Sequence, residues 1–315
     1  MPRIISCLIV LDIALAGRKL VAVSMEQGTA LVDVAQALRW ARGKLARAGI
    51  AAPVREALLI TAHVLGAEPT EAAASTGPLD EGERELLGEL VGKRCERYPL
   101  AYLLGHVGFL DFVLCVRPGV FVPRPETEGL AERARELAGT LPPGARVLDI
   151  GTGTGALAIA IARARADLRV VAVDISEVAL RCAWENAWRL GVLDRIEFRR
   201  SDLFQAVPER FHLIVSNPPY VPGPNIPELP PEVSVHEPRE ALDGGTSGAE
   251  LLKSIIAEAT SHLEFGGWLL CEIGHGQGSA LLRFAKGVAN WLELRVEEDL
   301  AGRERYLKGC LGPTT

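Results

Sequence analysis

The segment Asn217-Pro218-Pro219-Tyr220 carries groups that could hold a planar NH2 group. The apolar run before it, 211–216, is typical of a buried strand, and two successive prolines cannot continue the hydrogen-bond ladder of a sheet. Asn217 is therefore expected at the carboxyl end of a strand, where open α/β sheets bind ligands. The side-chain oxygen of Asn217 and the carbonyl of Pro218 could each accept one N–H hydrogen, while Tyr220 packs on the flat face of the group. The alternative is a turn that only ends the strand.

A second candidate site is the glycine-rich segment Gly151-Thr152-Gly153-Thr154-Gly155, between an expected strand at 146–150 and an expected helix at 156–162. Glycines allow a tight turn and a close approach of the backbone to a ligand. The next expected strand, 169–173, is followed by Asp174, at the spacing where an acidic residue reaches a pair of ribose hydroxyls. These features alone also suit a nucleotide or NAD. S-adenosylmethionine fits them best when the Asn-Pro-Pro-Tyr segment is considered as well.

Several separated segments together resemble a known family. Residues 149–155, Asp174 and 217–220 are similar to the class I S-adenosylmethionine-dependent methyltransferases that modify planar nitrogens. Val120-Phe121-Val122-Pro123-Arg124-Pro125-Glu126-Thr127-Glu128 resembles the signature of the peptide chain release factor glutamine N5-methyltransferases, the PrmC/HemK family. Further matching segments are 102–105, 237–242, 272–274 and 299–303, so the resemblance runs from about Met25 to the C-terminus.

The resemblance implies an enzyme of translation termination. It would transfer a methyl group from S-adenosylmethionine to N5 of the glutamine in the Gly-Gly-Gln motif of class 1 peptide release factors. The implied catalytic residues are Asn217, Pro218 and Tyr220, and Pro219 joins them in binding the substrate. The expected cofactor-binding residues are Gly151, Thr152, Gly153, Thr154, Gly155, Asp174, Asp202, Leu203 and Asn217.

One detail of this expected site stays open at the level of the sequence. Many relatives carry an aromatic residue at the position of Leu203, so either Leu203 or Phe204 could cover the adenine ring, with Asp202 accepting from its amino group. Arg124 and Glu126 are expected to be structural residues around the pocket.

Three alternatives share part of this pattern. The same four residues could hold the amino group of adenine in a nucleic-acid N6-methyltransferase. A net charge of −6, from 34 basic and 40 acidic residues, and a pI of about 5.7 disfavour a dedicated nucleic-acid binder. The sister enzymes that methylate a ribosomal-protein glutamine share Asn-Pro-Pro-Tyr but usually depart from the 120–128 signature. A catalytically silent S-adenosylmethionine-binding module is disfavoured by the intact segment 217–220.

Composition agrees with a cytoplasmic enzyme. The six cysteines form no Cys-x-x-Cys pair and the six histidines lack ligand spacing, so neither a metal site nor a disulfide framework is expected. The apolar run near the N-terminus is too short to span a membrane. We expect a monomer whose only macromolecular partner is the release factor, without direct contact to nucleic acid or membrane.

The predicted architecture is an α/β fold with a small N-terminal helical bundle. Residues 1–24 are expected to be an extension without function, and 25–100 to be a helical domain that, by resemblance, docks the protein substrate. Residues 101–122 are predicted to be a β-hairpin linker. Alternating strands and helices over 123–315 predict a Rossmann-like, mostly parallel sheet, with a helix at 131–137 and a proline-rich pocket wall at 221–248.

Overall fold

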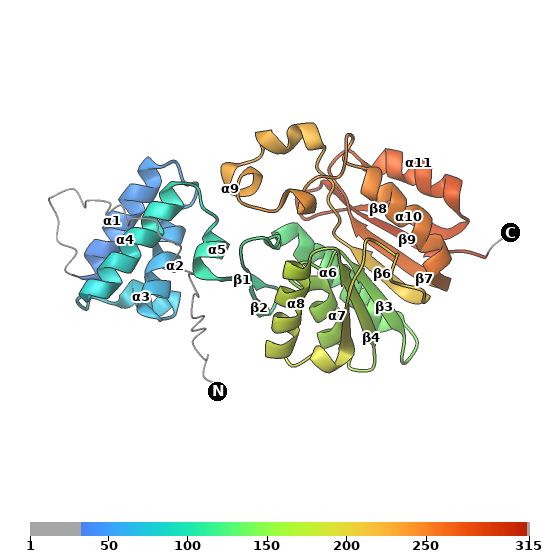
Figure 1. The fold of residues 1–315 in the computed structure, drawn as a ribbon, viewed down its shortest axis with the longest axis horizontal. Helices are drawn as coiled ribbons and strands as arrows, with labels where there is room; N and C mark the ends of the chain where they lie inside the picture. The colour runs from blue at the N-terminus through green and yellow to red at the C-terminus, as the bar shows by residue number, and fades with distance from the viewer. Residues whose placement is uncertain (1–32, 314–315) are drawn as a thin grey trace. The chain divides into compact units, whose positions relative to one another are not determined.

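A computed structural model describes residues 33–313, and the chain divides after Arg97 into two compact units. The predicted extension, 1–24, lies outside the described residues. Figure 1 shows the helices and strands of both units.

Helices make up the described part of the first unit. Asp33 caps the first helix by accepting from the backbone N–H of Gln36, and Asp80 and Glu83 form a reciprocal capping box at the start of the last. Apolar side chains at helical spacing are buried between the helices. The helices are α1 (Val34–Arg47), α2 (Pro53–Leu65), α3 (Pro69–Ala74) and α4 (Glu81–Cys95).

The second unit opens with a short helix and a hairpin. Helix α5 (Leu100–Leu104) precedes β1 (His106–Phe109), which pairs antiparallel with β2 (Phe112–Cys115). The sequence placed residues 101–122 in a linker. In the structure the hairpin lies with the second unit, because Phe109, Phe112 and Leu114 are buried in the core that also holds α6 and α7.

A seven-stranded sheet forms the centre of the second unit. Its strand order is β5-β4-β3-β6-β7-β9-β8, parallel from β5 to β7 and antiparallel at β9 and β8. The order reverses between β3 and β6, which is where open α/β sheets bind ligands. The strands are β3 (Arg146–Ile150), β4 (Arg169–Asp174), β5 (Ile196–Arg200), β6 (Phe211–Ser216), β7 (Leu263–Glu272), β8 (Trp291–Glu298) and β9 (Glu304–Leu311).

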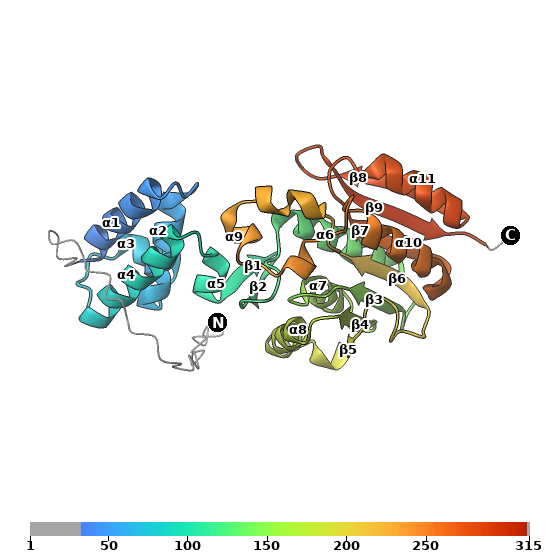
Figure 2. The same cartoon turned by 45° about the horizontal axis from the view of Figure 1, so that its top comes forward.

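Helices cover both faces of this sheet (Figure 2). Neighbouring residues of a strand point to opposite faces, so Val147 joins the core beneath α6 and α7, whereas Leu148 joins the core beneath α10 and α11. The Rossmann-like arrangement expected from the sequence is therefore confirmed. The covering helices are α6 (Pro125–Thr140), α7 (Ala156–Ala164) and α8 (Glu177–Arg189) on one side, and α10 (Glu250–His262) and α11 (Gly278–Val288) on the other.

Two element boundaries and one strand differ from the sequence expectation. Helix α6 begins at Pro125 rather than near 131, because proline is well suited to the first helical position. The apolar run 268–273 predicts a strand, and strand β7 begins five residues earlier, at Leu263. Strand β9 was not predicted. The proline-rich segment holds only short turns of helix, namely Gly223–Glu228, α9 (Pro231–Ser234) and Arg239–Ala241.

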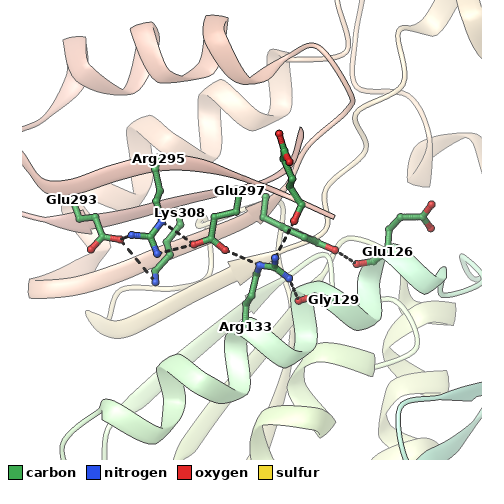
Figure 3. Close-up of polar contacts among 9 residues, drawn as sticks. Glu126, Gly129, Arg133, Glu293, Arg295, Glu297 and Lys308 are labelled. Atoms are coloured by element: carbon green, nitrogen blue, oxygen red, sulfur yellow. Dashed lines mark hydrogen bonds and ion pairs between the residues drawn. The ribbon is translucent and has the colours of Figure 1, made fainter. Parts of the chain in front are cut away.

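Helix α6 is fastened to the antiparallel end of the sheet (Figure 3). The Arg133 guanidinium lies 4.1 Å from the Tyr306 ring centre and donates to Glu297 over 2.7 Å. The Tyr306 hydroxyl donates to the backbone carbonyl of Glu126 over 2.8 Å. These contacts hold the first turn of α6, which lies against the cavity described next.

Candidate active site

A cavity of about 470 Å³ lies at the carboxyl ends of the parallel strands. The loops that follow β3, β4, β5 and β6 line it, as the switch in strand order predicts. It brings together nearly all of the residues that the sequence singled out. The lining includes Gly151, Thr152, Gly153, Thr154, Asp174, Asp202, Leu203, Asn217, Pro218, Pro219 and Tyr220.

Gly155 is the one predicted cofactor residue outside this lining. Its φ of +84° favours glycine, and a Cβ built there would lie 3.1 Å from Ala183 Cβ and 3.1 Å from Ile159 Cδ1. Gly155 therefore allows α7 and α8 to pack closely, rather than opening space for a ligand.

The glycine-rich loop is organised by a buried carboxylate. Asp149 lies near the carboxyl end of β3. It accepts from the Thr152 hydroxyl over 2.7 Å and from the backbone N–H of Ala158 over 3.1 Å. Burial raises the pKa of Asp149 to about 7, although both hydrogen bonds act in the opposite direction. Gly151 and Gly153 have φ values of +70° and +58°, so the loop turns where side chains are disfavoured.

Asp174 ends β4, lines the cavity and contacts this loop directly. One carboxylate oxygen accepts from the backbone N–H of Gly153 and the other from that of Ser176, each over 2.9 Å. Burial raises the pKa of Asp174, and these backbone hydrogen bonds oppose the shift. Each oxygen keeps a second lone pair, so the carboxylate can still accept hydroxyl hydrogens from a ligand.

Leu203 and Phe204, the two candidates for packing on the adenine ring, lie in different places in the structure. Leu203 lines the cavity, with φ at +46°, whereas Phe204 is buried in the core and stacks on His262 with ring centres 4.5 Å apart. Asp202 also lines the cavity and is exposed. Leu203 is thus the residue of this pair that can meet a ligand.

The Asn-Pro-Pro-Tyr segment follows β6, as expected, and is fixed by two residues to which the sequence gave no role. The Asn217 side-chain nitrogen donates to the Thr127 hydroxyl over 2.9 Å. Thr127 donates in turn to Glu272 over 3.0 Å, and the Tyr220 hydroxyl donates to the other Glu272 oxygen over 3.0 Å. Both new residues lie in segments that carry the family resemblance, which is the signal that could have found them.

Part of the remaining wall comes from the proline-rich segment, so the prediction that this segment lines the cavity is confirmed. Val221, Leu229, Val233 and Leu242 line the cavity. Arg124 lines it too, and its guanidinium forms an ion pair with the buried Glu237 carboxylate.

Neither a metal cluster nor a membrane span was found where the chain is described. Within residues 33–313, no three His, Cys, Asp or Glu side chains are grouped so that they could hold a metal ion. None of the helices in this range is long and apolar enough to cross a membrane.

Comparisons with known proteins identify the family. Residues 36–105 match the model of the PrmC N-terminal domain, and residues 112–231 match the methyltransferase small domain. A release factor glutamine methyltransferase from Cereibacter sphaeroides is 38% identical over 88% of this chain and 98% of its own length. This chain belongs to the release factor glutamine methyltransferase family. Another member, from Gloeobacter violaceus, is 42% identical over 72% of this chain and 80% of its own.

Family membership accounts for both the methyltransferase fold and the helical unit before it. Among solved structures, a release factor-specific protein-(glutamine-N5) methyltransferase from Alicyclobacillus acidocaldarius is 27% identical. That match covers 61% of this chain and 95% of the other, with a TM-score of 0.38, which is too low to add to the assignment.

Proposed function

We propose that this chain transfers a methyl group from S-adenosylmethionine to the side-chain nitrogen of the glutamine in the Gly-Gly-Gln motif of class 1 peptide release factors. Membership of the release factor glutamine methyltransferase family supports both the reaction and the acceptor. The observation that carries the proposal is the hydrogen bond from the Asn217 nitrogen to Thr127. It leaves the Asn217 oxygen to accept a hydrogen from a substrate NH2 group.

Orientation is the main contribution expected from the protein. An amide nitrogen is a poor nucleophile because its lone pair is delocalised, and well-positioned reactants can lower a barrier by roughly 7–11 kcal/mol. The nitrogen would form a bond to the methyl carbon as the carbon–sulfur bond breaks, which leaves neutral S-adenosylhomocysteine. The nitrogen would then lose one of its two protons to water. Oxygens of Asn217 and Pro218 would accept its hydrogens and stabilise the positive charge that develops on it.

The cavity residues fit the proposed cofactor. S-adenosylmethionine supplies a methyl group on a positively charged sulfur. Gly151 and Gly153 line the cavity without side chains, so a ligand can approach their backbone closely. The remaining lone pairs of the Asp174 carboxylate would accept hydrogen bonds from the ribose hydroxyls. We assign Asp202 to the adenine amino group and Leu203 to the face of the ring.

The first unit is assigned to substrate docking. Its match to the PrmC N-terminal domain supports a role specific to this family. We further propose that the enzyme acts as a monomer in the cytoplasm, where release factors work, and that it does not bind nucleic acid directly.

Transfer of labelled methyl to purified release factor tests the proposal, with mass spectrometry of the Gly-Gly-Gln peptide. We expect one methyl group on that glutamine and no label when it is replaced by alanine. Parallel incubations with DNA, RNA and ribosomal proteins test the alternative acceptors. Label on any of these, without label on release factor, would refute the proposed acceptor.

A further inference from the structure

Three segments far apart in sequence meet behind the Asn217 amide. Thr127 comes from the first turn of α6, Glu272 from the end of β7, and Tyr220 from the loop after β6. The Glu272 side chain is fully buried and accepts from Thr127 at one oxygen and from Tyr220 at the other. One carboxylate therefore fixes the Tyr220 hydroxyl directly and the Asn217 side chain through Thr127.

The chemistry of these groups fixes the direction of each hydrogen bond. An ionised carboxylate only accepts, so the single hydroxyl hydrogen of Thr127 goes to Glu272. The Thr127 oxygen can then only accept, which requires the nitrogen of the Asn217 amide rather than its oxygen. If the amide were rotated by half a turn, its own NH2 group would face the NH2 group of the substrate, and two donors cannot bond to each other.

We propose that Thr127 and Glu272 are positioning residues, which fix the Asn217 amide so that its oxygen rather than its nitrogen meets the substrate NH2 group. This inference rests on the proposed function in one respect, namely that the acceptor presents an NH2 group. Glu272 also fixes the hydroxyl of Tyr220. The relay therefore runs Glu272, Thr127, Asn217, substrate.

The position of Thr127 depends on how α6 is fastened. The backbone carbonyl of Glu126, the residue before Thr127, accepts from Tyr306. Arg133, two turns along the helix, donates to the backbone carbonyl of Glu298 over 3.0 Å and to the Glu297 carboxylate (Figure 3). Thr127 is itself 4% exposed. The relay is thus built on a rigid helix end rather than on a loop.

A protonated Glu272 would no longer fix the orientation of the Asn217 amide. Burial raises the pKa of Glu272 to about 7, while the hydrogen bonds from Tyr220 and Thr127 and the positive charge of Arg305 act against the shift. The negative charge of Glu126 raises the pKa of Glu272 further. The charge of Glu272 in turn helps to raise the pKa of the Tyr306 phenol. Once protonated, Glu272 could donate to Thr127, whose hydrogen would then be free to point at the Asn217 oxygen.

Two substitutions at Thr127 separate hydrogen bonding from packing. Valine keeps the shape and loses the hydroxyl, whereas serine keeps the hydroxyl and loses the methyl group. Because an unsatisfied polar partner weakens the site, we expect Thr127→Val to lower kcat about 10- to 100-fold with little change in the Kd for S-adenosylmethionine. Thr127→Ser should retain most of the activity. Thr140→Val, at the far exposed end of the same helix, is the matched control and should behave like the parent. Valine as active as serine would overturn the relay.

Glu272→Gln is the second variant, because it changes the direction of the hydrogen bonds without removing the side chain. Glutamine has one acceptor oxygen, so it cannot accept from both Thr127 and Tyr220 at separate oxygens. We expect a lower kcat, with the fall in parental kcat as pH drops through about 7 absent from the variant. A variant with the parental kcat would contradict the proposal.

A readout without any methyl acceptor separates this inference from the proposed function. Side-chain amide signals of ¹⁵N-labelled protein report the Asn217 NH2 group, identified by its loss in Asn217→Ala. One Asn217 amide hydrogen should exchange slowly in the parent and in Thr127→Ser, and faster in Thr127→Val. Equal exchange in all three would refute the relay. If release factor accepts no methyl group while the exchange differs as expected, the proposed function fails and the relay stands.

Discussion

The hydroxyl of Tyr306 donates to the backbone carbonyl of Glu126 over 2.8 Å, which joins the last strand of the sheet to the first turn of α6. This close approach has no room for a side chain one turn along the helix. A Cβ built on Gly129 would lie 2.2 Å from the Tyr306 hydroxyl oxygen and 3.1 Å from the ring carbon that carries it. Gly129 is therefore required by the contact that holds Thr127 near Asn217.

Gly129→Ala should lower the free energy of unfolding by about 1–3 kcal/mol, the usual range for an overpacked site. It should also reduce methyl transfer, because α6 must move. Gly139→Ala on the same helix is the control, since its Cβ would meet nothing within 4 Å. That variant should gain up to about 1 kcal/mol from helix propensity. Denaturant unfolding of both variants checks the pair, and effects of the same sign would argue against the packing account.

Glu272→Gln should change stability in a pH-dependent way. The pKa of Glu272 in the folded protein, about 7, lies above the usual value for an unfolded chain, so the folded state binds the extra proton between the two. The parent protein therefore loses stability as pH rises toward 7, because the unfolded chain ionises Glu272 before the folded state does. The stability difference, variant minus parent, should rise by at most about 1.4 kcal/mol per pH unit between pH 4.5 and 7 and then level off. Asp149 titrates in both proteins and cancels. A difference independent of pH would show that Glu272 keeps an ordinary pKa.

Leu203→Ala and Phe204→Leu should affect different properties. Leu203 lines the cavity, so its truncation should weaken S-adenosylmethionine binding by about 1–2 kcal/mol with little loss of stability. Phe204 is 4% exposed and packs on His262, so its replacement should lower stability by about 1 kcal/mol and leave cofactor affinity unchanged. Calorimetric titration and thermal unfolding distinguish the two. Loss of affinity only at Phe204 would reverse the assignment.

Asp174→Ala should weaken cofactor binding by about 1.5–3 kcal/mol, the typical contribution of hydrogen bonds to a charged group. The carboxylate ends β4 and faces the cavity. Asp194→Ala, at a side chain that is 77% exposed, serves as the control and should bind S-adenosylmethionine like the parent. Equal affinity in both variants by calorimetric titration would remove Asp174 from the cofactor site.

The sequence predicted those site residues whose position follows from local structure. Asp174 and Asn217 each come directly after an apolar strand, and parallel strands end at one edge of a sheet, so their proximity could be inferred without coordinates. The proline-rich wall was predictable for a related reason, because it begins at the cavity and the chain must return to the same sheet.

Other features depended on tertiary contacts that local patterns do not encode. Thr127 and Glu272 lie 90 and 55 residues from Asn217, on opposite sides of it in the sequence, and the packing of α6 against the sheet brings Thr127 into place. Gly155 follows the same loop pattern as Gly151, yet its close contact is with Ala183 on the next helix. Strand β9 escaped prediction although Tyr306 and Leu307 are buried, since its buried residues are consecutive and do not alternate with exposed ones.

The central claim is that the Asn217 oxygen orients the substrate amide, and the rate of methyl transfer to release factor by Asn217→Ala tests it most directly. The variant leaves the glycine-rich loop and Asp174 untouched, so calorimetry should find S-adenosylmethionine binding within a few-fold of the parent. Single-turnover transfer should fall on the order of 10²-fold or more, as for loss of a preorganised polar group. Transfer at the parental rate, with cofactor binding intact, would contradict the account and leave Asn217-Pro218-Pro219-Tyr220 as a turn that only ends a strand.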